Sequence, residues 1–207
     1  YFDGCGFGSC QNLDHGCGYR DEKGVVHPTW SILATRRTVS SGTYIAEIHK
    51  LDPLVQVTQH AAPLLAPIVE EGWEDSGIAR QAVERYLRPL LTDPRIDTLV
   101  LGCTHYPLLI DVLAGALPDD VTLLDPGPFV ATRLVDWLGR HPHFDIAAKP
   151  SQGAGSLRVL CTGEPDDFRR HGERFLGEAL PGIEHVAEVD GRLAHRDPTD
   201  APKGQVV

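Results

Sequence analysis

The chain has 207 residues, of which 42% are hydrophobic and 23% are charged, and these fractions are ordinary for a soluble globular protein. Its formal net charge of -10 argues against a general nucleic-acid-binding surface. No apolar run approaches the roughly 18 to 20 residues of a membrane helix, and the first residues lack the apolar core of a signal peptide.

The first 27 residues form a leader without a helical or strand period. Cys5, Cys10 and Cys17 lie in it, close to His15, but their spacing differs from the paired CxxC of most zinc sites. We therefore expect a flexible segment and no metal site. The full set of 5 cysteines is odd in number, which does not fit a secreted disulfide framework and favours a cytoplasmic protein with reduced thiols.

Strand and helix patterns alternate along the next hundred residues. Short apolar runs predict strands at 30–34, 55–59, 98–101 and 121–124. Helices are expected at 44–50, 64–71, 78–91, 108–117 and 130–138, with a polar capping loop at 35–42. This alternation, without hairpin signals, predicts an α/β fold with an open parallel sheet flanked by helices on both faces.

The remainder of the chain begins with a polar connection over 141–155. A strand is expected at 157–161, an amphipathic helix at 168–180 and a last strand at 183–189. The polar tail from Gly191 onward is predicted to be disordered.

Polar side chains follow the predicted strands at the points where each strand ends. They are Thr35 and Thr38 after the first strand, Gln59 at the end of the second, Cys103, Thr104 and His105 after the third, and Asp125 after the fourth. Because the carboxyl ends of parallel strands meet at one edge of the sheet, we expect a polar cleft there.

The most informative of these strand ends lies in residues 99–108, which read LVLGCTHYPL. A thiolate forms more readily beside a histidine or a helix N-terminus, and Cys103 has His105 two residues away and a predicted helix near Pro107. Such a thiolate can act as nucleophile, metal ligand or base. A cysteine at a strand end also serves as simple packing, but the adjoining threonine and histidine favour a functional role.

Four stretches of the chain resemble one enzyme family. Residues 99–108 resemble the second catalytic-cysteine motif of glutamate racemase, in the aspartate/glutamate racemase superfamily. Residues 33–44 (LATRRTVSSGTY) resemble its threonine-bearing substrate loop, and residues 63–72 (PLLAPIVEEG) its next helix. Residues 161–165 (CTGEP), with the phenylalanines at 168 and 175, resemble its C-terminal strand and helix. The resemblance covers about residues 28–190 in the family's order.

The resemblance implies two-base acid–base chemistry on either side of the substrate Cα, without a cofactor or metal. Cys103 would take the proton from the L-enantiomer and act as the acid in the other direction. His105 would assist Cys103. Glu70 matches a carboxylate that lies near the catalytic histidine, although a solvated helix end is an equally good interpretation of this residue.

The same resemblance assigns substrate binding to three threonines. Thr104 would bind the α-carboxylate or the amino group of the substrate, and Thr35 and Thr38 would hold its carboxylate through hydroxyl and backbone donors. The partner it implies is therefore a small molecule, glutamate, with no nucleic acid or membrane; a homodimer is an open possibility.

One part of the family pattern has no counterpart in this chain. The first half of a racemase carries an Asp-Ser pair and an Ala-Cys-Asn-Thr-type motif with the opposing cysteine, and the leader contains neither. The resemblance therefore implies the second half of a two-lobed racemase behind an unrelated leader. Its expected divisions are a leader at 1–27, one complete α/β lobe at 28–130, C-terminal elements of a second, incomplete lobe at 131–190, and a tail at 191–207.

The function implied by these residues is interconversion of L- and D-glutamate for peptidoglycan biosynthesis. Since one cysteine cannot protonate the opposite face of Cα, we expect this chain alone to exchange the α-proton of L-glutamate without racemising it. Two alternatives remain at this point: a non-catalytic lobe that binds an acidic amino acid or another subunit, and a racemase that acts on aspartate or a hydantoin.

Overall fold

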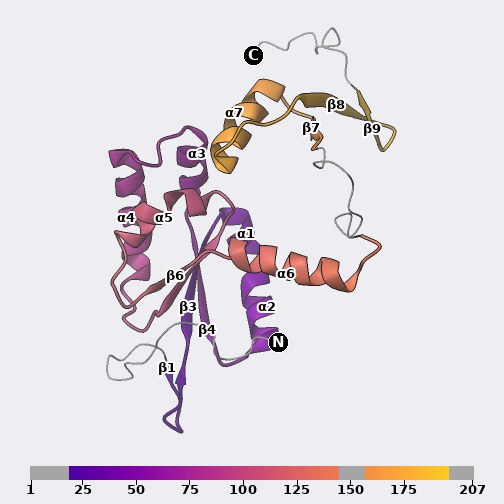
Figure 1. Ribbon diagram of the computed structural model, residues 1–207. Coiled ribbons are helices and arrows are strands. Elements are labelled where there is room, and N and C mark those ends of the chain that lie inside the picture. Colours follow the sequence, from indigo (N-terminus) through magenta and orange to yellow (C-terminus); the bar gives the residue numbers. More distant parts are fainter. Residues whose placement is uncertain (1–18, 145–156, 196–207) are drawn as a thin grey trace. The chain divides into compact units, whose positions relative to one another are not determined.

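The computed structural model describes residues 19–144 and 157–195, and the chain divides into two compact units between Trp137 and Leu138 (Figure 1). The strands of the first unit are β1 (Tyr19–Arg20), β2 (Val26–His27), β3 (Thr29–Ala34), β4 (Gln56–Ala61), β5 (Thr98–Gly102) and β6 (Thr122–Leu124). Its helices are α1 (Arg36–Ser41), α2 (Thr43–Leu51), α3 (Leu65–Glu70), α4 (Gly77–Leu90), the 3-10 helix η2 (Tyr106–Leu109), α5 (Ile110–Ala114) and α6 (Gly127–Arg140), whose last residues belong to the second unit.

The first unit is built on a four-stranded parallel sheet with the strand order β4-β3-β5-β6. In its register, Ala34 of β3 pairs with Ala61 of β4 on one side and with Gly102 of β5 on the other. The carboxyl ends of these three strands therefore lie side by side. The predicted open parallel sheet flanked by helices is confirmed.

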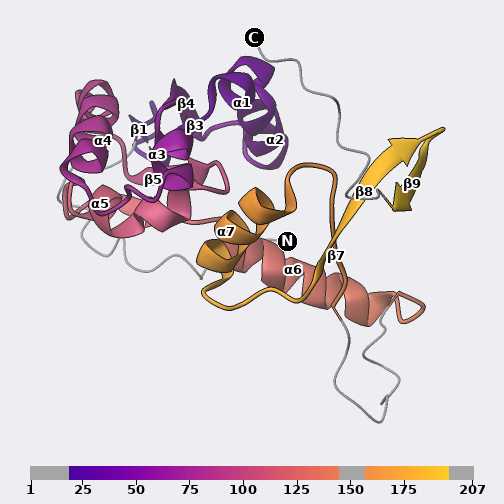
Figure 2. The same cartoon turned by 90° about the horizontal axis from the view of Figure 1, so that it is seen from above.

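The two faces of this sheet are covered differently, and Figure 2 shows α4 and α5 on one side of it and α1 and α2 on the other. The face that carries Leu33, Leu99 and Leu101, here called the α4 face, contributes to a large buried cluster with α3, α4, η2 and α5. The opposite face, here called the α2 face, buries only Ile32, Ala34 and Val100 completely. Neither α1 nor α2 contains a fully buried residue.

The sequence of helix α4 accounts for both its start and its buried face. The Ser76 side chain accepts a hydrogen bond from the backbone N–H of Ala79 at 3.1 Å, which satisfies one of the free donors of the first turn. One face of the helix then buries Ala79, Val83, Leu87 and Leu90 at helical spacing. Strand β5 instead buries three consecutive residues, as expected for a central strand with both faces covered.

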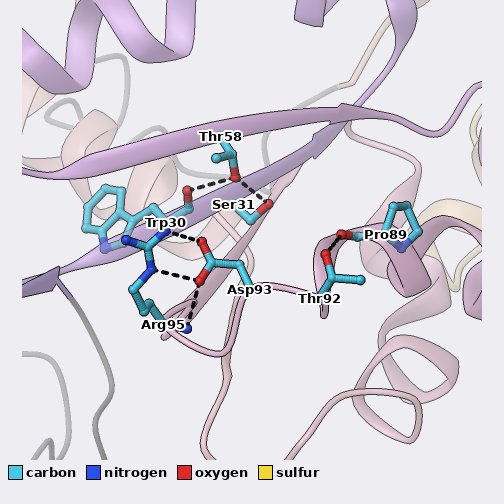
Figure 3. A network of polar contacts seen from close by, with 7 residues as sticks. All are labelled: Trp30, Ser31, Thr58, Pro89, Thr92, Asp93 and Arg95. Carbon is cyan, nitrogen blue, oxygen red and sulfur yellow. Dashed lines mark hydrogen bonds and ion pairs between the residues drawn. The ribbon is translucent and has the colours of Figure 1, made fainter.

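The start of β5 is held by polar contacts around the loop that leads into it (Figure 3). Arg95 binds the Asp93 carboxylate through two nitrogens at 2.9 and 2.8 Å. On the neighbouring strands, the hydroxyls of Ser31 and Thr58 lie 3.1 Å apart and link β3 to β4 (Figure 3). The first contact thus orders the loop before β5, and the second joins β3 to β4.

Two local expectations in the first unit are wrong. Residues 35–42 are not a loop: Arg36–Ser41 form α1, because the Thr35 side chain caps the helix and Gly42 ends it with a left-handed φ of 63°. The helix expected at 108–117 begins as the 3-10 turn η2 at Tyr106 and ends at Ala114.

Two antiparallel pairings also depart from the expectation that hairpins are absent. Strands β1 and β2 pair across a turn in which the Asp21 carboxylate accepts backbone N–H bonds from Lys23 and Val25 at 2.9 and 2.8 Å. In the second unit, β8 pairs with β9 across Asp190 and Gly191, whose φ values of 52° and 73° suit a tight hairpin turn. Residues 192–195 are therefore a strand rather than part of a disordered tail.

The second unit contains β7 (Val159–Cys161), α7 (Pro165–Leu176), β8 (Ile183–Val189) and β9 (Arg192–His195). Strand β7 runs parallel to β8, with α7 as the connection between them. Helix α7 starts three residues before the predicted position, because Pro165 suits the first turn of a helix, and it ends at Gly177 with φ 71°.

Candidate active site

Cys103 follows the last residue of β5, and its half-buried side chain packs against the cluster of the α4 face. The preceding Gly102 is needed for this position, because a Cβ there would lie 2.9 Å from the Cβ of Ala34 and 3.0 Å from a methyl group of Ile32. The glycine thus lets β3 and β5 approach closely at the point where the thiol leaves the sheet.

The thiol, an imidazole and a carboxylate form a connected series. The Cys103 Sγ lies 3.8 Å from Nδ1 of His105, and Nε2 of His105 lies 3.1 Å from Oε1 of Glu70. A carboxylate can only accept, so it selects the tautomer with the proton on Nε2. Nδ1 then presents its lone pair to the thiol, which is the arrangement needed to withdraw the thiol proton.

Glu70 is the last residue of α3, whose Leu65, Ile68 and Val69 are buried in the α4-face cluster. The Glu70 side chain remains 50% exposed, and that of His105 is 24% exposed. An ion pair this accessible to water adds little to stability. Glu70 thus stands at an exposed helix end, and its carboxylate also lies within 3.1 Å of the His105 imidazole.

Two tyrosines that were not singled out from the sequence lie near enough to Cys103 for its charge to affect their hydroxyls. Burial, and then the negative charge of a Cys103 thiolate, raise the pKa of the Tyr44 hydroxyl above its usual value. The same two causes, followed by the charge of Tyr86, raise the pKa of Tyr106. Both phenols therefore stay protonated across the physiological range and can act only as neutral groups beside the thiol.

The predicted substrate threonines lie beside this series. Thr35 and Cys103 each follow a member of the Ala34–Gly102 pair, so they occupy adjacent strand ends. The Thr35 hydroxyl lies 3.0 Å from that of Thr38 and accepts the Thr38 backbone N–H at 3.3 Å. Thr104 is exposed on the turn between Cys103 and His105. The structure thus gathers the threonines around the same sheet edge.

Two other polar residues at the strand ends are used locally. The Gln59 side-chain nitrogen donates to the Val39 carbonyl oxygen at 3.4 Å, beneath α1. The Asp125 carboxylate accepts the backbone N–H of Gly127 at 2.8 Å, where α6 begins. Both contacts support helices rather than the thiol.

Within residues 19–144 and 157–195, no group of three or more His, Cys, Asp and Glu side chains is arranged to hold a metal ion. No helix in the same ranges is long and apolar enough to cross a membrane. The leader cysteines and His15 lie outside the part of the chain that the structure describes. Cys161 is a free, buried thiol of the second unit.

Comparison with known proteins gives one consistent answer, although no family model matches the chain. Glutamate racemase from Syntrophus aciditrophicus is 38% identical over 155 residues, and that from Neisseria gonorrhoeae is 41% identical over 156 residues. Each alignment covers 75% of this chain but 56% of the relative. The chain therefore spans only a little over half the length of these curated relatives.

Solved structures agree with the sequence comparison. Glutamate racemase from Francisella tularensis, in complex with D-glutamate, matches with a TM-score of 0.69 at 30% identity, over 77% of this chain and 58% of that chain. A glutamate racemase isoform from Bacillus anthracis matches with a TM-score of 0.67 at 32% identity, over 77% of this chain and 57% of that chain.

Proposed function

Since three quarters of this chain is homologous to glutamate racemases, we propose that it carries one of the two acid–base groups of glutamate racemisation, with Cys103 as the group that exchanges the α-proton. The observation that supports this most directly is the series of contacts from Cys103 through His105 to Glu70, at 3.8 and 3.1 Å. The fold of the first unit, shared with the structures of glutamate racemases, supports it as well.

The proposed step is a proton transfer at Cα. His105 takes the thiol proton through Nδ1, and Glu70 stabilises the imidazolium that forms. The Cys103 thiolate then removes the Cα proton of L-glutamate, and the electron pair remains on the substrate as a carbanion. Return of the proton from Cys103 regenerates L-glutamate, whereas D-glutamate requires a second donor on the opposite face.

We further propose that three threonines bind the substrate beside the thiol. The hydroxyls of Thr35 and Thr38 satisfy each other at 3.0 Å and can turn toward an anionic carboxylate instead. Thr104 is exposed on the reactive turn and is available to the α-carboxylate or the amino group. Hydroxyl and backbone donors at these positions would suit the carboxylates of a small acidic amino acid.

The cellular role that follows is the supply of D-glutamate for peptidoglycan, in the cytoplasm, where thiols stay reduced. A homodimer is compatible with this role. The names of the relatives favour glutamate over aspartate or a hydantoin as substrate. The Cys103–His105–Glu70 series favours a catalytic lobe over one that only binds an amino acid.

Deuterium exchange tests the proposal. The chain is incubated with L-glutamate in D2O, the loss of the Cα–H signal is followed by proton NMR, and circular dichroism follows the formation of D-glutamate. We expect exchange with retention of the L-form and no accumulation of D-glutamate. A folded chain that leaves the Cα–H of L-glutamate unexchanged would contradict the proposal.

Two variants give the control. Cys103→Ser should abolish exchange, because a hydroxyl is a far weaker acid than a thiol at neutral pH. Cys161→Ser changes a buried thiol of the second unit and should leave the exchange rate unchanged. If exchange persists without Cys103, another group removes the proton and the assignment is wrong.

A further inference from the structure

Tyr106 is the largest of the fully buried side chains, and it directly follows His105. Its hydroxyl donates a hydrogen bond to the carbonyl oxygen of Ala62 at 2.9 Å, across 44 positions of sequence. We infer that Tyr106 is a positioning residue: its hydroxyl, anchored on the Ala62 carbonyl, sets the place of His105 between Cys103 and Glu70. The inference rests on the proposed function of this site and assigns a residue to its geometry.

The first part of the argument is the turn that holds the reactive residues. The Tyr106 backbone N–H donates to the Cys103 carbonyl oxygen at 3.1 Å, and the Leu108 N–H donates to that of His105 at 3.1 Å. Tyr106 therefore closes the turn through its main chain. Its ring, which is 0% exposed, fixes the orientation of this turn relative to the core.

The second part is the anchor. The Ala62 carbonyl oxygen also accepts the N–H of Leu65 at 3.1 Å, at the start of α3. The other end of α3 carries Glu70, whose carboxylate binds His105. The contacts thus form a closed ring that runs from His105 to Tyr106, to Ala62, along α3 to Glu70, and back to His105. In such a ring the His105–Glu70 distance depends on the hydroxyl of Tyr106.

The third part is the connection to the threonines. The Ala62 N–H donates to the carbonyl oxygen of Ala34 at 2.8 Å, and Ala34 immediately precedes Thr35. Through its N–H and its C=O, Ala62 therefore joins the ends of β3 and β4 to the turn that follows β5. The hydroxyl of Tyr106 completes this junction from the side of the thiol.

The chain offers a matched control in Tyr86. This tyrosine of α4 packs against the same cluster, and its hydroxyl accepts the N–H of Leu64 at 3.4 Å. It thus contacts the same segment that precedes α3, but not the turn with Cys103 and His105. Tyr86→Phe removes an equal group from the same core without breaking the ring of contacts.

The test is a double-mutant cycle on the alkylation rate of Cys103. The whole chain is treated with iodoacetamide between pH 6 and 9, and the rates of Cys103 and Cys161 are read separately by peptide mass spectrometry. We expect His105→Ala to lower the Cys103 rate near pH 7 by roughly tenfold in the wild type, but by less than about threefold in Tyr106→Phe. In Tyr86→Phe the effect of His105→Ala should stay within about twofold of its wild-type value.

Two outcomes would overturn the inference. The first is a His105→Ala effect on the Cys103 rate that is equally large with and without the Tyr106 hydroxyl. The second is a His105→Ala effect that shrinks as much in Tyr86→Phe as in Tyr106→Phe. Leu109→Val loosens the packing of η2 but keeps the hydroxyl, so it separates lost packing from the lost hydrogen bond. The proton-exchange assay stands apart from this test: coupling without exchange contradicts the proposed function, and exchange without coupling contradicts the role of Tyr106.

Discussion

The two faces of the four-stranded sheet differ in how densely side chains pack against them. On the α4 face, four helical segments bury a cluster that includes Leu33, Leu87 and Leu113. On the α2 face, a groove of about 320 Å³ opens between the sheet, α2 and the start of α6, with Trp30 and Val100 among its lining residues. One face of the sheet is therefore a closed core and the other is thinly covered.

The candidate acid–base group belongs to the closed face. Cys103 packs against its cluster, and Glu70 and His105 come from α3 and from the turn before η2, both anchored in it. Tyr44, by contrast, belongs to α2 and lines the groove of the open face. The proposed acid–base group therefore lies on the densely packed side of the sheet, and the groove lies on the thinly covered side. The following four predictions test this difference, from the largest effect to the smallest.

Truncation of a buried side chain should lower the free energy of unfolding more on the α4 face than on the α2 face. Leu87→Ala removes a side chain that is 1% exposed on the α4 face, so we expect a loss of about 2–5 kcal/mol in the free energy of unfolding. Ile48→Ala on the α2 face removes a partly buried chain and should cost about 1 kcal/mol. Urea unfolding followed by circular dichroism measures both. Equal losses would mean that the two faces are packed alike.

Gly102→Ala tests the close approach of β3 and β5 at the α2 face. The new Cβ would lie 2.9 Å from the Cβ of Ala34, so the strands must separate, and we expect a cost of about 1–3 kcal/mol. The same assay measures it, and alkylation of Cys103 reports whether the thiol moves. Gly139→Ala, in a helix with open space at that position, is the control and should not destabilise the chain.

The cap of the buried helix α4 should contribute more to stability than a side-chain hydrogen bond inside the exposed helix α1. Ser76→Ala removes the cap of α4 and should cost about 1 kcal/mol. Ser40→Ala removes an exposed hydroxyl that bonds the Arg36 carbonyl inside α1, and we expect a change within about 0.5 kcal/mol. Thermal unfolding of both variants would refute this ordering if the Ser40 change proved the more harmful.

The smallest predicted effect is a pH dependence of stability that arises from Asp97. Burial raises the pKa of the Asp97 carboxyl above 3.8, although the Thr98 hydroxyl and the Thr29 N–H donate to it. The folded chain then holds this proton more tightly than the unfolded chain, so the contribution is complete below the ordinary Asp pKa and is lost as pH rises through the raised value.

We therefore expect the stability of the wild type relative to Asp97→Asn to be greatest at the acid end of this range and to decline as pH rises. Urea unfolding of both proteins at a series of acidic pH values measures the difference. A difference that stays constant, or grows with pH, would show that the pKa shift has the opposite sign.

Much of the first unit could be predicted because its signals are local. The apolar run at 98–101 ends at a glycine, so both the central strand and the placement of Cys103 follow from a few neighbouring residues. Helix α4 shows the helical spacing of its buried face in the same way. The parallel sheet then follows from the alternation of elements, whereas the strand order β4-β3-β5-β6 and the register come from the structure alone.

The parts that were missed depend on signals of another kind. Helix α1 has no buried residue and hence no apolar period, and only the capping side chain of Thr35 marks it. The hairpin at Asp190 and Gly191 carries a typical dipeptide that was passed over in a polar tail. The partner of the Tyr106 hydroxyl lies 44 residues away and is a backbone atom, so no side chain at its position indicates it.

The anchor at Ala62 has a consequence for how the site responds to mutation. Every amino acid supplies the same carbonyl oxygen, so no substitution at position 62 can delete the acceptor of the Tyr106 hydroxyl. A substitution there acts instead through the new side chain, which must fit a position that is 0% exposed, or, for proline, through loss of the N–H that donates to Ala34. The acceptor of this hydrogen bond is thus present whatever amino acid stands at position 62, whereas the donor depends on the tyrosine at position 106.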